Sequence, residues 1–124
     1  MNARTILPLM DITLRPIPRY IDELASHGGL KGVDIANITD VSKATVSRWK
    51  AGDIKPQPRS KLIVSDLHYV VSRLREFYTP EDIRTWLYAW HPQLGGQRAI
   101  DAIHDKRTLD VLDVIDRLEN EAFL

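Results

Sequence analysis

The chain has 124 residues, the length of one typical domain, and 44% of them are apolar, which is enough to bury a core. Cysteine is absent, which excludes disulfides, cysteine-ligated zinc, iron–sulfur clusters and thiol catalysis. No apolar run approaches the roughly 18 residues of a membrane span, so we expect a soluble, cytoplasmic protein with no membrane partner.

The net charge is zero, but the two signs are segregated along the chain. Residues 31–61 hold seven basic and three acidic residues, whereas residues 62–124 hold seven basic and eleven acidic ones. A basic centre followed by an acidic half favours two partners of different character, one of them an anion. Chance clustering of charge is the alternative.

Turn-forming residues divide the first half of the chain into short segments. Residues 1–18 contain three prolines and no sustained period, which predicts an irregular arm. A helix is expected over about 19–27, ended by Gly28-Gly29 because glycine adopts the left-handed C-terminal conformation without a clash. Two more short helices are expected over about 33–38 and 43–50.

The second half carries longer helical patterns. Apolar residues from about 59 to 78 recur at spacings of three and four, which predicts an amphipathic helix. Thr79 is a candidate N-cap of the next helix. Trp86 lies within that helix and is expected in the core. A short helix over about 97–104 and a last helix capped by Thr108 complete an all-α fold. It has seven helices at most and no convincing strand.

No arrangement of residues points to catalysis or to a metal. The four histidines do not pair at metal-ligand spacings, and the sequence has no GxSxG, GxGxxG or phosphate-loop motif. Asp110, Asp113 and Asp116 fall three apart and are expected on a solvated helix face rather than in an acid–base pair. We therefore expect no cofactor, no metal and no enzymatic activity.

The strongest signal lies in residues 33–52, whose pattern predicts helix, tight turn and helix. Asp40 falls where the turn needs a left-handed backbone, and Ser42 can cap the second helix. Val46 and Trp49 are expected to face the core. The outward positions carry small, hydroxylated or basic residues, which contact bases and phosphates in a major groove. The candidate DNA-binding residues are Ser42, Lys43, Ala44, Thr45, Ser47, Arg48 and Lys50.

This stretch resembles the helix-turn-helix of the Xre (lambda-repressor-like) regulators, whose second helix often reads close to S-x-x-T-V-S-R-W-x-x-G. Residues 42–52 read SKATVSRWKAG, and Asp40 stands where that family prefers glycine. The resemblance implies DNA binding through the second helix, with a dimer on two half-sites. A helical hairpin of the same shape that does not bind DNA is the alternative.

Residues 79–124 resemble the toxin-binding domain of the MbcA/ParS/Xre antitoxins, with the pattern W-L-x(4–7)-L-x-G-x-x-P before a Val/Leu-rich helix. The matching residues are Trp86, Leu87, Leu94 and Gly96. Ala99 stands where the family commonly has proline, and Lys106-Arg107 falls where glycine is usual. With the helix-turn-helix, the resemblance divides the chain into an arm (1–18), an Xre-like helix-turn-helix (19–58), a connecting helix (59–78) and a toxin-binding domain (79–124).

The resemblance implies an antitoxin that binds and neutralises a RES-domain toxin encoded in the same operon; such toxins consume NAD. It also implies repression of that operon, and a homodimer or a higher hetero-oligomer with the toxin. The residues expected to contact the toxin are Trp90, Leu94, Gly95, Gly96, Gln97, Arg98, Glu119, Glu121, Phe123 and Leu124. A stand-alone Xre repressor with a C-terminal oligomerisation domain is the alternative.

The end of the chain is both acidic and apolar. Residues 108–124 hold five acidic residues and one basic residue, and the chain ends in Glu121-Ala122-Phe123-Leu124. Together with the resemblance of residues 79–124, this ending is predicted to enter or border the NAD cleft of the toxin, with Phe123 as the anchor. The alternative is a helix end that folds back on the core.

Overall fold

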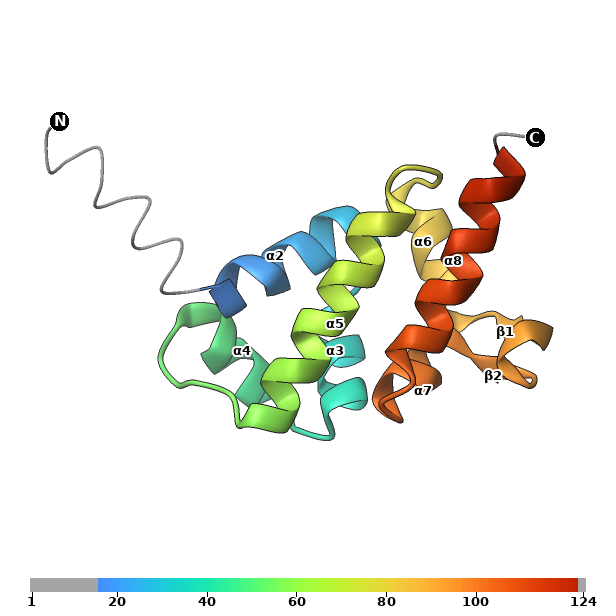
Figure 1. Ribbon diagram of the computed structural model, residues 1–124. Helices are drawn as coiled ribbons and strands as arrows, with labels where there is room; N and C mark the ends of the chain where they lie inside the picture. The colour runs from blue at the N-terminus through green and yellow to red at the C-terminus, as the bar shows by residue number, and fades with distance from the viewer. Residues whose placement is uncertain (1–15, 123–124) are drawn as a thin grey trace, which may run out of the picture.

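The computed structural model describes residues 16–122 and is mainly helical in that range, which confirms the all-α prediction (Figure 1). The α-helices are α2 (Pro16–Gly28), α3 (Gly32–Thr39), α4 (Lys43–Ala51), α5 (Pro58–Leu74), α6 (Pro80–Tyr88), α7 (Ala99–His104) and α8 (Thr108–Ala122). Between α6 and α7 lie β1 (Trp90–His91), a 3-10 turn (Pro92–Leu94) and β2 (Gln97–Arg98). The predictions for residues 1–15, Phe123 and Leu124 lie outside the described residues.

Helix α5 is the centre of the fold (Figure 1). It packs against α2 and α3 from the first half of the chain and against α7 and α8 from the second half. Its core face buries Val64, Leu67, Val70 and Leu74 completely. One continuous apolar cluster therefore joins residues from all four predicted parts of the chain.

Local capping interactions set several helix ends as the sequence predicts. The Ser42 hydroxyl accepts a hydrogen bond from the Thr45 backbone N–H at 3.1 Å and so caps α4. The Thr79 hydroxyl does the same for α6 through the Asp82 N–H at 3.3 Å. Asp40 adopts φ +60° after α3, which confirms the left-handed turn.

Two predicted boundaries at the helix ends are wrong. Helix α2 begins at Pro16 rather than 19, because prolines in the first turn remove N–H groups that have no helical partner there. Helix α5 ends at Leu74 rather than 78, since the N–H groups of Phe77 and Tyr78 both turn back to the Leu74 carbonyl. The residue before Pro80 also disfavours helical backbone.

Two local predictions in the second half need correction for tertiary reasons. Residues 97–98 form a strand rather than the start of a helix, because Gly95 and Gly96 reverse the chain onto Trp90–His91. Thr108 opens α8, but its hydroxyl donates to Asp66 on α5 at 2.9 Å instead of capping its own helix.

The tryptophans differ in burial. Trp49 is 3% exposed, as predicted. Trp86 is only partly buried and packs at the edge of the core. Its ring lies against His91, with ring centroids 4.4 Å apart. The prediction that Trp86 is a core residue is therefore only half correct. Trp90 is 68% exposed.

Trp49→Ala should lower the free energy of unfolding by about 3–5 kcal/mol, because it leaves a large cavity beneath α4. Urea denaturation followed by circular dichroism measures this change. The matched control is Trp90→Ala, which removes the same side chain from the surface and should cost less than about 1 kcal/mol. Equal losses in the two variants would contradict the burial of Trp49.

Candidate functional site

Helix α4 presents a continuous polar face to solvent. Val46 and Trp49 attach it to the core at 2% and 3% exposure. The intervening positions point outward, and the exposed predicted residues are Lys43, Ala44, Ser47, Arg48 and Lys50. The structure thus brings the predicted DNA-binding residues onto one surface, with Ser42 at its N-terminal end.

The side chains on this face differ in how freely they can contact a ligand. Ser42 and Thr45 share a hydroxyl–hydroxyl hydrogen bond of 3.0 Å, and Lys50 lies 3.7 Å from the Asp22 carboxylate. Within residues 16–122, Lys43 and Arg48 form no side-chain hydrogen bond or ion pair. Arg48 is therefore the candidate for a direct base contact.

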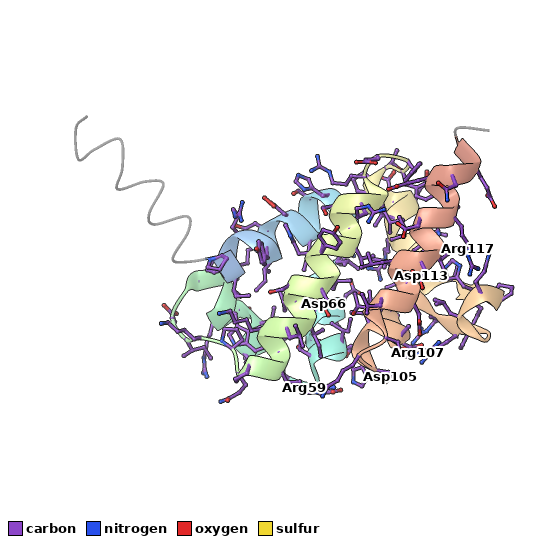
Figure 2. The ribbon with its side chains drawn as sticks, viewed as in Figure 1. Arg59, Asp66, Asp105, Arg107, Asp113 and Arg117 are labelled. Atoms are coloured by element: carbon purple, nitrogen blue, oxygen red, sulfur yellow. The ribbon has the colours of Figure 1, made fainter. Side chains whose placement is uncertain are left out.

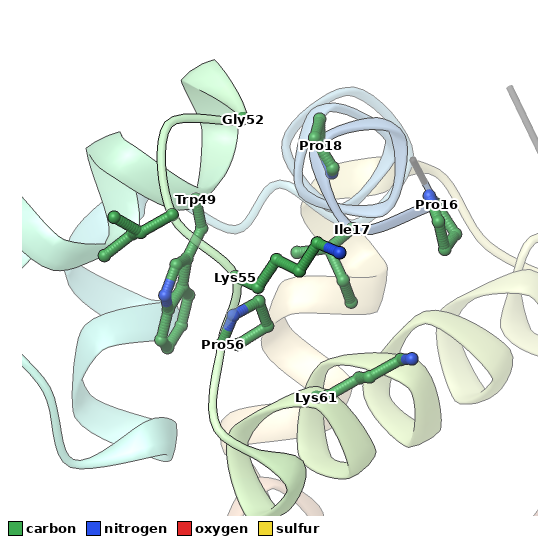
Figure 3. Close-up of a pocket in the computed structure, with 9 residues that line it drawn as sticks. Pro16, Ile17, Pro18, Trp49, Gly52, Lys55, Pro56 and Lys61 are labelled. Carbon is green, nitrogen blue, oxygen red and sulfur yellow. The ribbon is translucent and has the colours of Figure 1, made fainter. Parts of the chain in front are cut away.

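A cavity of about 210 Å³ lies beside the C-terminal end of α4 (Figure 3). Its walls include the Trp49 ring, Pro16 and Pro56, and the side chains of Lys55 and Lys61 border it. The two lysines add positive charge beside the C-terminal end of α4.

The β1–β2 hairpin presents Trp90 to solvent on a preorganised support. Trp90 pairs with Arg98 across the ladder, and the Arg98 guanidinium lies 5.6 Å from the Trp90 ring centre and 5.5 Å from that of Tyr88. Asp101 holds this guanidinium with two hydrogen bonds of 2.7 and 3.0 Å. An exposed aromatic ring with restricted motion is typical of a protein-binding hot spot.

The turn of the hairpin favours glycine because of its backbone conformation, and not because a larger residue would collide with neighbouring atoms. Gly95 and Gly96 adopt φ +70° and +79°, and a Cβ atom added at either position would have no neighbouring atom within 4 Å. Leu94 is 1% exposed, because its side chain packs in the core and attaches the hairpin to it. The prediction that Leu94 contacts a partner directly is therefore corrected to a supporting role.

The acidic end of α8 is partly used inside the molecule. Arg73 on α5 donates to Glu119 at 2.6 Å and to Asp116 at 2.8 Å. These hydrogen bonds, Asp116 first, raise the pKa of Arg73. Glu121 is exposed. Of the two predicted acidic toxin contacts, only Glu121 is free of an internal partner among the described residues.

The buried carboxylate of Asp34 on α3 connects this helix to α6, the helix that precedes the hairpin. The Asp34 side chain is 5% exposed and accepts hydrogen bonds from the Arg84 guanidinium, Tyr88 Oη at 2.6 Å and the Lys31 N–H at 2.7 Å. Burial raises the pKa of Asp34, but these donors outweigh it and the pKa lies below its usual value. Burial, followed by the bond to Asp34, raises the pKa of Tyr88 to about 12.

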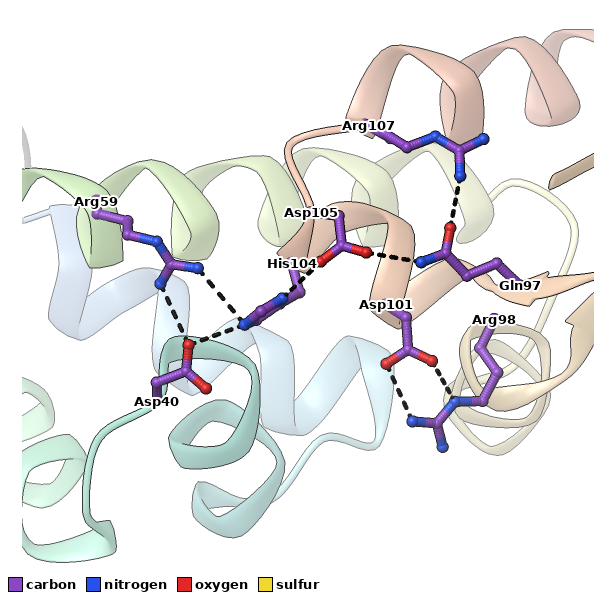
Figure 4. Close-up of polar contacts among 8 residues, drawn as sticks. All are labelled: Asp40, Arg59, Gln97, Arg98, Asp101, His104, Asp105 and Arg107. Carbon is purple, nitrogen blue, oxygen red and sulfur yellow. Dashed lines mark hydrogen bonds and ion pairs between the residues drawn. The ribbon is translucent and has the colours of Figure 1, made fainter. Parts of the chain in front are cut away.

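A second polar network links the turn after α3 to α7 (Figure 4). The His104 ring contacts Asp40 through Nε2 at 2.8 Å and Asp105 through Nδ1 at 2.9 Å. Asp105 continues to Gln97, which accepts from Arg107 at 2.6 Å. The hydrogen bonds to Asp105 and then Asp40 raise the pKa of His104.

Sequence reasoning missed both networks. Asp34, Arg84, Tyr88 and His104 show no motif, and the contacts that join Arg84 and Tyr88 to Asp34, and His104 to Asp40, span 50 or more residues. Within the described range, no cluster of histidine and carboxylate residues could hold a metal ion. No helix in that range is long and apolar enough to cross a membrane.

Comparison with known proteins gives a consistent set of relatives, although no family model matches the sequence. The chain is 31% identical over 96 residues to the probable mycobacterial cidal antitoxin Rv3188 of Mycobacterium tuberculosis, covering 77% of this chain and 82% of that protein. It is 28% identical to the mycobacterial cidal antitoxin MbcA of Mycobacterium bovis, covering 77% and 85%.

The fold also matches a solved structure. A chain in the crystal structure of the M. tuberculosis MbcT–MbcA toxin–antitoxin complex superposes with a TM-score of 0.75 at 25% identity. The match covers 86% of this chain and 96% of that one.

The His104 contacts predict a pH-dependent contribution to stability. The pKa of His104 is raised in the folded state, so its contribution is complete below about pH 6.5, the usual histidine value, and is lost as pH rises through the folded pKa. The difference in unfolding free energy between wild type and His104→Gln should therefore shrink with rising pH. Urea titrations across this range measure it.

Asp40→Asn is the matched control for this experiment, since it removes one of the two carboxylates that face the ring. The Arg59 guanidinium, at 3.5 Å, opposes protonation and stays in both variants. The pH dependence due to His104 should be weaker in Asp40→Asn. A profile of His104→Gln parallel to that of wild type at every pH would contradict this account.

Proposed function

The chain belongs to the MbcA-type antitoxins of toxin–antitoxin systems, and from this premise we propose that it neutralises a RES-domain toxin that consumes NAD. The observation that carries the proposal is the match to a chain of the MbcT–MbcA complex over 86% of the present chain. The toxin is expected to be encoded in the same operon. Neutralisation requires binding alone, which agrees with the absence of catalytic motifs from the sequence.

Two surfaces of the second half support direct binding to a toxin. The hairpin offers Trp90 as an aromatic anchor, and Arg98, Asp101 and Tyr88 hold it in place, so little conformational entropy is lost on binding. The sequence ends in the acidic and apolar segment Glu121–Leu124, whose first two residues are the last two of α8. The Glu121 carboxylate would pair with the basic side chains that hold the phosphates of NAD in the toxin.

The α4 face supports a second activity, repression of the operon by DNA binding. Its exposed cations, Lys43 and Arg48, have no competing partner within residues 16–122, and Lys55 and Lys61 extend the positive surface. One such helix contacts few base pairs, so specific repression would use a homodimer, or a hetero-oligomer with the toxin, on two half-sites.

A stand-alone Xre repressor is the alternative function, and the exposed α4 face is the observation that favours it. Co-expression with the neighbouring open reading frame separates the two. A tight stoichiometric complex supports the antitoxin, whereas a lone dimer on DNA supports the repressor.

Arg48→Ala should lower affinity for the promoter of the operon and relax sequence preference, because a bidentate base contact is worth roughly 1–3 kcal/mol. Lys50→Ala should instead weaken binding to all sequences and flatten its salt dependence. Fluorescence anisotropy at several salt concentrations measures both effects. If wild type does not distinguish its promoter from random DNA, the repressor activity is refuted.

Deletion of the last four residues and Trp90→Ala should each impair protection against the toxin while leaving the fold intact, since neither change touches the core. The readouts are growth and NAD content of cells that co-express the neighbouring toxin. The control is Arg48→Ala, which alters the α4 face and should protect fully. Full protection by the truncated protein would show that the ending is not inhibitory, and full protection by both variants would refute this binding surface.

A further inference from the structure

One face of the molecule carries apolar side chains that nothing in the described structure covers. Helices α5 and α8 run side by side on this face (Figure 2). They are joined by Asp66–Thr108 at 2.9 Å and Arg73–Asp116 at 2.8 Å. Three large side chains of these two helices remain exposed: Leu62 at 53%, Tyr69 at 50% and Leu109 at 76%. An exposed apolar patch of this kind marks an interaction surface.

The three side chains lie on the same side of the helix pair. Leu62 and Tyr69 are one turn to either side of Asp66, at the spacing that places them on one stripe of α5. Leu109 follows Thr108 and shares its stripe of α8 with Asp113, four residues later. The stripes border each other through the two polar contacts that join the helices.

The same face also carries a cavity that fits such a side chain. It measures about 300 Å³ and lies between the start of α5 and the end of α7. Leu62, Ile63 and Ile103 supply its apolar wall. The charged side chains that line it are Arg59, Lys106 and Asp66, and Asp66 already accepts a hydrogen bond from Thr108. A protruding Leu109 and a recess for an apolar side chain therefore occur together on one surface.

The charged side chains on this face are complementary too, with an anion beside the protruding leucine and a cation beside the cavity. Asp113 lies beside the protruding Leu109, and Lys106 lies at the rim of the cavity. Neither has a side-chain partner within residues 16–122, whereas Asp110 on the other side of Leu109 is already paired with Arg107 at 2.9 Å. A second chain that inserts its own Leu109 into this cavity would bring its Asp113 close to Lys106 at the cavity.

The backbone at Lys106 gives a further reason to assign its side chain a role. Lys106 adopts φ +64°, a left-handed conformation that is strained for a lysine and costs glycine little. It closes α7 by donating to the Ile103 carbonyl at 3.2 Å, a position at which glycine is the usual residue. A lysine at this strained position places a cation at the rim of the cavity.

We infer that this face, formed by Leu62, Tyr69, Leu109 and the cavity rimmed by Lys106, is an interface with a second copy of the chain. Protrusion, recess, cation and anion all lie on one surface, which is the requirement of a two-fold interface in which each copy offers the same patch. Leu109 of each copy enters the cavity of the other, and Asp113 meets Lys106 twice. The α4 face and the hairpin lie to either side of this face and stay accessible (Figure 1).

Sedimentation equilibrium of the full chain alone tests the inference, without toxin or DNA, so its failure would leave the proposed function intact. Wild type should form dimers. Leu109→Ser should raise the dimer Kd at least roughly 100-fold, because truncation of an interface anchor costs about 10-fold or more and a two-fold interface loses it twice. The control is Val33→Ser, an exposed apolar residue on α3, which should leave the Kd unchanged.

A charge exchange tests the contact between the two copies. Lys106→Glu and Asp113→Lys should each weaken the dimer by about 10-fold, because each places like charges together. The double variant K106E/D113K restores both contacts in the dimer and should return the Kd to within a few-fold of wild type. Lys106→Gly should raise the melting temperature by relieving the strained backbone and yet weaken the dimer, which separates stability from association.

Three results would overturn the inference. The first is a chain that stays monomeric at every concentration. The second is a dimer that Leu109→Ser and the charge variants leave unchanged. The third is a normal dimer of Leu109→Ser whose complex with the toxin is weakened, because that result would assign the face to the toxin.

Discussion

The arrangement of the whole molecule depends on the buried carboxylate of Asp34. Removing an ionised carboxylate from water costs several kcal/mol unless charged and polar donors replace the lost hydration. Here the Arg84 guanidinium, the Tyr88 hydroxyl and a backbone N–H supply them. Because these donors come from α6 and from the segment before α3, the carboxylate is satisfied only when α3 and α6 lie together. Arg84 also donates to the Gly29 carbonyl at 3.2 Å, which fixes the turn between α2 and α3.

This constraint connects the α4 face to the hairpin. The α4 face is attached to α3 by a turn that His104 holds through Asp40, and the hairpin is attached to the same network through Gln97. Tyr88 reaches from Asp34 to the Arg98 guanidinium that supports Trp90. The candidate DNA surface and the candidate toxin surface are thus connected by polar contacts as well as by the common packing on α5.

Departures from the resembled family patterns have local explanations. Asp40 replaces the usual glycine, and aspartate tolerates the left-handed backbone better than most residues. Its carboxylate also gains the contact with His104. Ala99 stands where proline is common, and it is the first residue of α7, the helical position that accepts proline most readily. Lys106 replaces a glycine at a second left-handed position, where the backbone bears the strain.

The sequence by itself determined the elements whose causes are local. Ser42 and Thr79 cap helices through N–H groups three residues away, and apolar spacing placed Val46 and Trp49 in the core, because such interactions depend only on the helical repeat. Tertiary structure decided the contacts of Asp34 with Arg84 and of His104 with Asp40, 50 and 64 residues apart, as well as the burial of Leu94 and the strand at 97–98. These features exist only once helices from both halves pack on α5, and no local pattern encodes which distant side chains then meet.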